Sequence, residues 1–494
     1  MKRLHNLMLA GTGSDVGKSI ITTGLCRIFK QDGYTPAPFK AQNMALNSFA
    51  TLDGFEIGRA QAVQAEAAGI PCSTDMNPIL LKPMGNHTSQ VVLNGKPIGN
   101  RDAYDYFRKE GRDELRQEVL KAFKRLEAKH NPIVLEGAGS VSELNLRDSD
   151  LVNMPMAREA DADVILVADI DRGGVFASAY GSIMLQKPED KARIKGIIVN
   201  KFRGDMRLFD EGRRIMEEIC GVPVIGVVPY FKDIHIEEED SVSLDFKQRQ
   251  AAEGKINVAV VMLRHISNFT DFNRLERHPD VHLYYTNNVD EIAKAQIVIL
   301  PGSKSTIADL AELRRNGAAQ AILKARAAGA TILGICGGYQ MMGLEVADPD
   351  GIEGDTPVFP GLGLLPTKTV LKDEKVTRQM PFQFNGQPKD CVGYEIHMGE
   401  TSITDSSAKP LNKLADKRTE GCIVDEKCMG TYLHGILDND SVIEYLLSTQ
   451  RKADKVAESI DYETYKQVQY DALAEELRKY LDMNLLYKIL GRDA

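Results

Sequence analysis

The stretch Leu333-Gly334-Ile335-Cys336-Gly337-Gly338-Tyr339-Gln340 predicts a sharp turn from a buried strand into a helix, with a cysteine at the corner. The apolar run before Cys336 is typical of a strand, and the glycines after it allow the chain to turn at once. A similar geometry exposes the nucleophile of hydrolases that carry a Gly-x-Ser-x-Gly motif. Because a helix N-terminus favours the thiolate, a cysteine placed there is activated for attack. Cys336 is therefore either a catalytic nucleophile or a structural cysteine beside a glycine-rich turn.

The composition is that of an ordinary globular protein. The chain has 494 residues, of which 43% are apolar and 27% charged, and its net charge is −9. At ~150 residues per domain, this length predicts two to four domains. The acidic balance gives no reason to expect nucleic acid or an anionic membrane as a partner. No run approaches the ~18 apolar residues that span a bilayer, and the apolar run after Met1-Lys2-Arg3 is too short for a signal peptide.

Cysteine usage points to a reducing compartment. The seven cysteines are odd in number, scattered and without Cys-x-x-Cys spacing. This pattern supports neither a disulfide framework nor a zinc site. We therefore expect a cytoplasmic protein.

A phosphate-binding loop is predicted near the N-terminus. Residues 4–10 are typical of a buried strand, an apolar helix follows from Ile20 to Phe29, and between them lies Gly11-Thr12-Gly13-Ser14-Asp15-Val16-Gly17-Lys18-Ser19. In such a loop the backbone N–H groups surround the phosphates, the lysine reaches the terminal phosphates and the hydroxyl binds Mg²⁺. The sequence therefore predicts MgATP binding by Thr12, Gly13, Gly17, Lys18 and Ser19. Thr12 replaces the usual first glycine, and Gly13 stands where partition-type ATPases carry a signature lysine, which weakens the interpretation as a ParA-like switch.

Further strands alternate with helices and end in polar residues, which is typical of a doubly wound parallel sheet. Glu136 follows a buried strand beside the phosphate loop, where a second Mg²⁺ contact is expected. Lys40 either approaches the phosphates or is a solvated lysine at a strand end. Asn200 either contacts the adenine edge or caps a turn.

Five blocks in order resemble a known family; they are the phosphate loop, Phe39–Ser48 (Phe-Lys-Ala-Gln-Asn-Met-Ala-Leu-Asn-Ser), Glu136–Ser140, Asp169–Gly174 and Asn200–Asp205. Together they resemble the cobyric acid synthases, whose N-terminal half is similar to dethiobiotin synthetase. The resemblance covers nearly the whole chain and implies an ATP-dependent ligase that converts corrin-ring carboxylates to amides. It further implies a corrinoid substrate, adenosylcobyrinic acid a,c-diamide, amidated at the b, d, e and g carboxylates.

A second α/β domain is predicted after an acidic linker at residues 237–254. One of its strands leads into Pro301-Gly302-Ser303, where a glycine turn can offer backbone N–H groups to an oxyanion. Another leads into Cys336, and residues 429–433 lead into His434. A cysteine and a histidine that are distant in sequence but both at strand ends suit nucleophilic thiol catalysis. The alternative for His434 is a hydrogen-bonded core histidine.

This half resembles a class I glutamine amidotransferase domain, through the pattern Gly-x-Cys-x-Gly-x-Gln at 334–340. The resemblance implies that Gly337 and Gln340 contact L-glutamine and its oxyanion. The usual family pattern places Pro-Glu after the histidine, whereas Gly435-Ile436 follows here, as in the cobyric acid synthase branch. The residue that orients the imidazole is therefore open. Glu395 is one candidate, and a substrate-contact or interface role for its loop is the alternative.

The sequence as a whole predicts an α/β protein with two doubly wound domains and a helical C-terminal extension. The expected bounds are 1–236 for the ATP-binding domain, 255–447 for the amidotransferase domain and 448–494 for the extension. Its leucines 473, 477, 481 and 485 predict packing against the core or a partner subunit, which leaves a homo-oligomer open. The competing functions are the sibling cobyrinic acid a,c-diamide synthase, CTP synthase (whose histidine is followed by Pro-Glu) and an ATPase switch with an inactive glutaminase domain.

Overall fold

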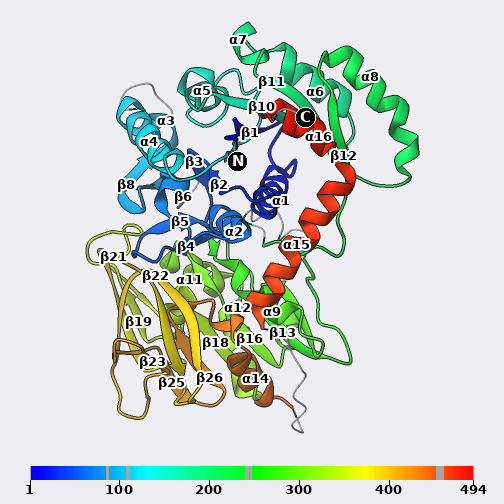
Figure 1. The fold of residues 1–494 in the computed structure, drawn as a ribbon. Coiled ribbons are helices and arrows are strands. Elements are labelled where there is room, and N and C mark those ends of the chain that lie inside the picture. The colour runs from blue at the N-terminus through cyan, green and yellow to red at the C-terminus, as the bar shows by residue number, and fades with distance from the viewer. Residues whose placement is uncertain are drawn as a thin grey trace.

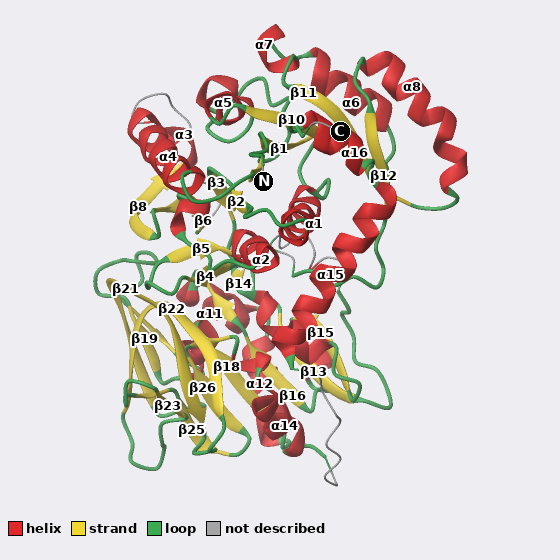
Figure 2. Cartoon of the chain, viewed as in Figure 1, coloured by secondary structure: helices red, strands yellow, loops and turns green. Residues whose placement is uncertain are grey.

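The computed structural model describes residues 2–84, 88–106, 112–237, 239, 244, 247–451 and 461–492. Two α/β bodies lie one above the other in Figure 1, the N-terminal half above and the second half below. Figure 2 shows that each body combines a strand layer with helices. The predicted α/β class is confirmed, and part of the predicted linker lies outside the described residues.

The N-terminal body is built on a six-stranded parallel sheet in the order β12-β11-β10-β1-β9-β2. Its strands form because their apolar runs are buried on both faces by helices. The chain runs from β1 to β2 at one edge and later crosses from β9 to β10, so a ligand crevice is expected at the ends of β1 and β9. The strands are β1 (Asn6–Gly11), β2 (Ala37–Phe39), β9 (Ile133–Glu136), β10 (Ala162–Asp169), β11 (Ile194–Phe202) and β12 (Val224–Pro229). The helices are α1 (Lys18–Gln31), α2 (Arg59–Ala68), α4 (Arg112–Glu127), α5 (Met154–Glu159), α6 (Val175–Met184), α7 (Pro188–Lys191) and α8 (Asp210–Cys220).

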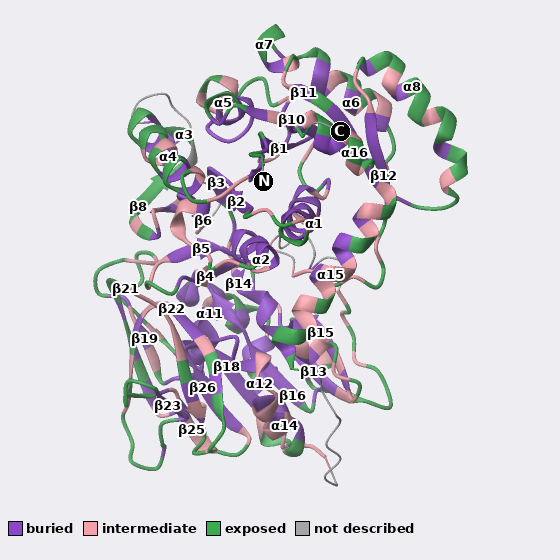
Figure 3. Ribbon diagram, in the orientation of Figure 1, coloured by how far each residue is buried: buried purple, intermediate pink, exposed green. Residues whose placement is uncertain are grey.

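A smaller sheet and a short hairpin in this body were not predicted. The sheet contains β3 (Gln42–Met44), β6 (Ile79–Pro83), β7 (Thr88–Leu93) and β8 (Lys96–Asp102), and α3 (Ala103–Tyr106) follows it. The hairpin pairs β4 (Ser48–Ala50) with β5 (Glu56–Gly58). Figure 3 shows buried residues along α2, β5 and β14, where the two bodies meet.

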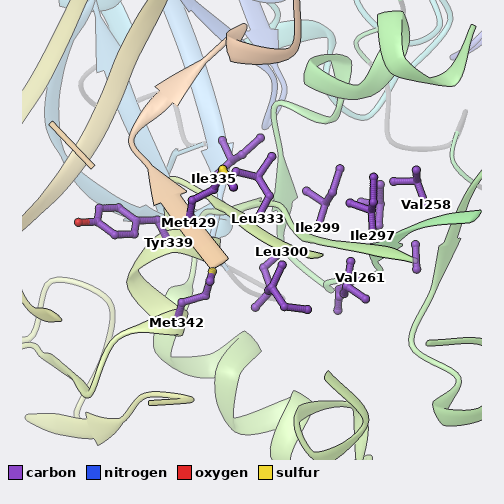
Figure 4. Close-up of a cluster of buried hydrophobic side chains, with 14 of the residues drawn as sticks. Val258, Val261, Ile297, Ile299, Leu300, Leu333, Ile335, Tyr339, Met342 and Met429 are labelled. Atoms are coloured by element: carbon purple, nitrogen blue, oxygen red, sulfur yellow. The ribbon is translucent and has the colours of Figure 1, made fainter. Parts of the chain in front are cut away.

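The second body also has a six-stranded sheet, in the order β15-β13-β16-β18-β26-β25, parallel except for β25. Figure 4 shows its core, in which side chains such as Val258, Ile299 and Leu333 pack together from neighbouring strands. The strands are β13 (Ile256–Val261), β15 (Val281–Thr286), β16 (Ile297–Leu300), β18 (Thr331–Ile335), β25 (Cys422–Asp425) and β26 (Cys428–Thr431). The helices are α9 (Asn273–Glu276), α10 (Val289–Ile292), α11 (Thr306–Arg315), α12 (Ala318–Ala327), α13 (Gly337–Met342) and α14 (Asp440–Ser448).

A second sheet of this body carries a long hairpin that the sequence did not predict. It contains β19 (Glu345–Ala347), β20 (Val358–Pro360), β21 (Thr367–Phe384), β22 (Asp390–Ile403), β23 (Asn412–Leu414), β24 (Thr419–Glu420) and β27 (Leu433–His434). A separate two-stranded ribbon pairs β14 (Ile266–Ser267) with β17 (Gly302–Ser303). In the register of β22 and β27, Tyr394 lies opposite His434. The long hairpin therefore reaches the predicted catalytic histidine.

The C-terminal helices α15 (Tyr462–Tyr480) and α16 (Met483–Ile489) pack against the N-terminal body, beside α1 (Figure 1). Leu473 and Leu477 are fully buried there, and a Cβ added at Gly24 would lie 2.2 Å from Leu477 Cδ1. Leu481 follows the last turn of α15 and Leu485 belongs to α16, so the predicted stripe spans a helix break. The prediction that these leucines pack against the core is confirmed. None of the helices in the described part of the chain is long and apolar enough to cross a membrane.

Candidate functional site

Cys336 occupies a strained corner between β18 and α13. Its φ is +51° and its ψ is −110°, a conformation that side-chain-bearing residues rarely adopt and that concentrates at active sites. The turn is tight because a Cβ at Gly338 would lie 2.0 Å from the Leu300 carbonyl oxygen, and one at Gly334 would lie 2.6 Å from Met342 Sδ. The predicted strand–turn–helix is present, with Cys336 only 7% exposed.

His434 is held by a carboxylate that sequence reasoning did not identify. Its Nδ1 lies 2.7 Å from Asp271 Oδ2, and the N–H of Gly435 donates to Asp271 Oδ1 at 2.9 Å. Burial lowers the pKa of His434, but the Asp271 charge and hydrogen bond, with the Cys336 side chain as a further partner, outweigh it and raise this pKa to about 10. The Tyr394 ring stacks on the imidazole at a centroid distance of 5.4 Å. Cys336, His434 and Asp271 thus form a connected thiol, imidazole and carboxylate, the arrangement that nucleophilic thiol catalysis requires.

Glu395 does not take the orienting position. Its carboxylate pairs with Arg378 and lies 3.6 Å from His397 Nε2. The structure therefore assigns the orienting role to Asp271 and corrects the expectation for Glu395. Asp271 is the last but one residue of a short 3₁₀-helix, Phe269–Phe272, which follows β14. The available signal was a largely polar stretch, Ser267-Asn268-Phe269-Thr270-Asp271, a few residues after the first strand of the second body.

The residues predicted to contact glutamine surround the Cys336–His434 pair. A Cβ at Gly302 would lie 3.1 Å from His434 Cε1, and one at Gly337 would lie 2.7 Å from the Ser303 backbone nitrogen. Both glycines therefore let backbone approach the site closely. The Gln340 side chain accepts from Thr306 Oγ1 at 2.9 Å and donates to the Tyr432 hydroxyl at 3.2 Å. Contacts of these three residues with substrate remain predictions.

The phosphate loop of the N-terminal body converges on Glu136. The Ser19 hydroxyl donates to Glu136 Oε1 at 2.9 Å, Lys40 Nζ donates to the same oxygen at 2.8 Å, and Gln64 donates to Oε2 at 2.6 Å. Lys40 is 8% exposed, so the alternative of a solvated lysine is wrong. Burial, followed by the charge of Lys40, lowers the pKa of Lys18 to about 8.

Hydrogen bonds within the phosphate loop and to neighbouring strands fix its conformation. Lys18 Nζ donates to the carbonyls of Gly13 and Gly139 at 2.9 and 3.0 Å. The Thr12 N–H is taken by the Val167 carbonyl of β10. The Asn200 amide donates to the Val16 carbonyl at 2.9 Å, and a Cβ at Gly17 would collide with it. Asn200 thus braces the loop, and its contact with adenine remains a prediction.

The donor set of this site suits a magnesium ion. Ser19 and Glu136 offer hard oxygen ligands next to the expected phosphate position, which is the kind of site that Mg²⁺ occupies with nucleotides. No cluster of three or more His, Cys, Asp or Glu side chains arranged to hold a metal occurs among the described residues. Ser19 and Glu136 are therefore the protein ligands that we expect for Mg²⁺ beside the nucleotide phosphates.

A cavity of about 1500 Å³ opens from the phosphate loop toward the second body. Lys18, Lys40 and Glu136 line one part of it, and His265 and Phe269 of the second body line another. The volume exceeds that of ordinary small-ligand pockets. The cavity can therefore hold a nucleotide together with a large second substrate.

Comparison with known protein families matches one family model to each of the two bodies. Residues 7–244 match the CobQ/CobB/MinD/ParA nucleotide binding domain, and residues 257–442 match the CobB/CobQ-like glutamine amidotransferase domain. The cobyric acid synthase of Phocaeicola vulgatus is 67% identical over 99% of this chain and 99% of its own length. That of Bacteroides fragilis has the same identity and coverage, and that of Parabacteroides distasonis is 56% identical over 98% of this chain and 99% of its own.

The fold and the two sites define a P-loop ATP-dependent ligase joined to a glutamine amidotransferase. With relatives this similar over almost the full length, the chain belongs to the cobyric acid synthase family.

Proposed function

We propose that this chain uses ATP and glutamine to amidate the b, d, e and g carboxylates of adenosylcobyrinic acid a,c-diamide, giving cobyric acid in cobalamin biosynthesis. The observation that carries the proposal is the pairing, in one chain, of a Cys336–His434–Asp271 site with a Lys18–Ser19–Glu136 site beside a cavity of about 1500 Å³. The seven free cysteines are consistent with a reduced cytoplasmic location.

The second body generates ammonia. The Cys336 thiolate attacks the side-chain amide of glutamine, and backbone N–H groups near Gly302 and Gly337 stabilise the oxyanion. His434, held protonated by Asp271, gives its proton to the leaving nitrogen, which departs as ammonia. Water then hydrolyses the thioester, which releases glutamate and restores the thiol.

The N-terminal body activates the carboxylate. A free carboxylate is a poor electrophile, so one of its oxygens first attacks the γ-phosphate of ATP, giving an acyl phosphate and ADP. Lys18 and the loop N–H groups stabilise the transferring phosphoryl group, and Ser19 and Glu136 would hold Mg²⁺, which neutralises phosphate charge. Ammonia then displaces inorganic phosphate and forms the amide. Each cycle converts one glutamine and one ATP.

Ammonia has to reach the acyl phosphate before it is protonated. Phe269, which belongs to the same 3₁₀-helix as Asp271, lines the cavity of the N-terminal body. We infer a sheltered route past this helix from Cys336 to the cavity. Full exchange of ammonia with solvent during coupled turnover would contradict the route.

The test is to replace the nucleophile and change the nitrogen source. In Cys336→Ala, glutamine-dependent amidation of the a,c-diamide is abolished, and amidation with added ammonia and MgATP continues, because the N-terminal site is untouched. Mass spectrometry of the corrinoid follows each conversion. An unchanged corrinoid with the unaltered chain, while glutamine is still hydrolysed, would reject the substrate.

The same experiment separates the alternatives. A cobyrinic acid a,c-diamide synthase would consume the corrinoid that lacks the a and c amides. A switch protein with an inactive glutaminase domain would release no glutamate. The presence of Asp271 on His434 argues against that reading, since its main support was the missing glutamate after the histidine.

A further inference from the structure

The segment Asn47-Ser48 of the N-terminal body holds a turn of the second body through two reciprocal hydrogen bonds. The N–H of Phe269 donates to Asn47 Oδ1 at 3.1 Å, and the N–H of Ser48 donates to Asn268 Oδ1 at 2.8 Å. Asn47, Ser48 and Asn268 are 1%, 0% and 3% exposed. Both bonds therefore lie in a dry interface, where a missing partner is costly.

The turn that these bonds hold leads directly to the acid of the glutaminase site. Asn268 has a φ of +52°, in the left-handed region, and precedes the 3₁₀-helix Phe269–Phe272. The N–H of Asp271 donates to the Asn268 carbonyl at 3.0 Å, which closes the turn. Asp271 in turn accepts from His434 and from the Gly435 N–H. A shift of Asn268 therefore moves Asp271 relative to His434.

On the side of the N-terminal body, the Asn47-Ser48 segment is hydrogen-bonded to residues that line the large cavity. Asn47 Nδ2 donates to the Glu239 carbonyl at 2.8 Å, and Asn43 Nδ2 donates to Glu239 Oε2 at 2.7 Å. The N–H of Ala60, in α2, donates to Glu239 Oε1 at 3.1 Å. Asn43, Asn47, Ala60 and Glu239 all line the cavity. The wall of the ATP-side cavity and the acid of the glutaminase site thus share one hydrogen-bonded path.

We propose that Asn268 is a positioning residue of the glutaminase, through which the N-terminal body orients Asp271 and so His434. This inference rests on the proposed function, because it explains how glutamine hydrolysis depends on the ATP-binding body. It also gives a role to the Asn43–Ser48 block, which phosphate binding does not require. Asn268 does not line the cavity, so its replacement leaves the substrate surfaces in place.

The test compares Asn268→Gly with Asn268→Asp. Glycine adopts the left-handed conformation but lacks the oxygen that accepts from Ser48, whereas aspartate tolerates the conformation and keeps an oxygen acceptor. For Asn268→Gly we expect the kcat of glutamine-dependent amidation to fall about tenfold, as for one lost buried hydrogen bond. The KM for glutamine and the ammonia-dependent rate stay near those of the unaltered chain. Asn268→Asp recovers most of the glutamine-dependent rate.

The readouts separate positioning from general folding. Equal losses of the glutamine-dependent and ammonia-dependent rates in Asn268→Gly would overturn the proposal, as would unchanged rates or a failure of Asn268→Asp to recover. A failure of the proposed function looks different, because the unaltered chain would then release glutamate without amidating the corrinoid. In that case the kcat of glutamate release in the two variants still decides whether Asn268 positions the site.

Discussion

At the scale of single residues, the orientation of His434 depends on one carboxylate, that of Asp271. Asp271 Oδ2 contacts the imidazole and Oδ1 contacts the next backbone N–H, so this side chain fixes both the ring and the strand end that carries it. A neutral replacement of the same shape keeps the packing but removes the charge that stabilises the imidazolium. The chemical and structural roles of Asp271 can therefore be separated.

We expect Asp271→Asn to lower the kcat of glutamine hydrolysis on the order of 10²–10⁴-fold, as in other catalytic triads. The Asp271 charge opposes burial and raises the pKa of His434 to about 10. Without that charge the pKa of His434 falls. As pH rises, the imidazole of the variant therefore loses its proton, and the residual activity with it, at a lower pH than in the unaltered chain. Rates of glutamate release across a pH series test this. Glu395→Gln is the matched control, since it neutralises the acid that does not touch His434; an equal loss there would contradict the assignment.

Glu136 is the corresponding residue of the ATP-binding site. Glu136→Gln removes the negative charge that Ser19 and Lys40 contact, and it removes the Glu136 contribution that raises the pKa of Lys18. We expect glutamine-dependent and ammonia-dependent amidation to fall together, on the order of 10²-fold, because transition-state charge is no longer balanced. Glutamate release, measured on the same sample, should persist as the control for folding. Amidation at the unaltered rate would show that Glu136 has no part in phosphoryl transfer.

Sequence reasoning located the residues that lie beside their own motifs. Cys336 and Glu136 lie at strand ends, and Lys18 and Ser19 begin α1 after the loop, as their patterns predict; their catalytic and binding roles stay predictions. Asp271 belongs to no pattern, because its partner is 163 residues away and the contact exists only after β14 and β27 come together. The sequence therefore left the orienting residue open, with Glu395 as one candidate, and only the fold identifies Asp271 as the carboxylate that contacts His434.

Among helices and strands too, those with a local sequence pattern were predicted and those without one were not. Parallel strands that are buried on both faces read as continuous apolar runs, and these were predicted in both bodies. The hairpin β21–β22 was not predicted, because most of its residues are exposed or half-buried and its sequence therefore lacks a continuous apolar run. The C-terminal leucines predicted packing but not its target, since one apolar stripe suits either the core or a partner subunit.

The C-terminal helix α15 should contribute to the stability of the N-terminal body. Leu477 is fully buried against α1, where Gly24 leaves no room for a side chain. We expect Leu477→Ala to lower the free energy of unfolding by about 2–5 kcal/mol, through lost burial and the cavity that remains. Leu208→Ala removes the same atoms at a site that is 83% exposed and should change little. Calorimetry of both variants tests this; equal melting temperatures would show that α15 is not part of the folded N-terminal unit.

At the scale of the whole molecule, the two bodies share a buried cluster of charges. Glu56 of β5 accepts from Lys82 Nζ at 2.6 Å and pairs with Lys375 of the long hairpin in the second body. The side chain of Glu56 is fully buried, and the two lysines hold its pKa well below the usual range against the effect of burial. Lys304, beside the Gly302 turn, is half-buried, and burial together with the charges of Lys375 and Lys82 lowers its pKa to about 7. Glu56 is thus the carboxylate that pairs with Lys82 and Lys375 between the bodies.

Glu56→Gln should therefore weaken the joint between the bodies. We expect a loss of about 3–5 kcal/mol in the free energy of unfolding at neutral pH, because Lys82 and Lys375 keep their charges in a dry site without the carboxylate. The folded-state pKa of Lys375, which burial already lowers, then falls further below the unfolded value of about 10.4. Since the unfolded chain binds more protons in that window, the stability of the variant rises as pH rises toward the unfolded pKa, and its deficit narrows.

Calorimetry of Glu56→Gln from slightly acid to alkaline pH measures this deficit. Glu211→Gln is the control, because it breaks an exposed pair with Arg214 one turn away on α8, where solvent screens the charges. If the charge cluster holds the bodies together, Glu56→Gln loses much of the free energy of unfolding, and this loss shrinks as pH rises. Glu211→Gln then loses almost none at any pH. It also predicts that glutamine-dependent amidation suffers more than the ammonia-dependent reaction, since Lys375 and Lys304 adjoin the glutaminase site. If Glu56→Gln melted like the control at every pH, the cluster would not hold the bodies together, and other contacts, such as the Phe269–Asn47 and Ser48–Asn268 hydrogen bonds, would do so.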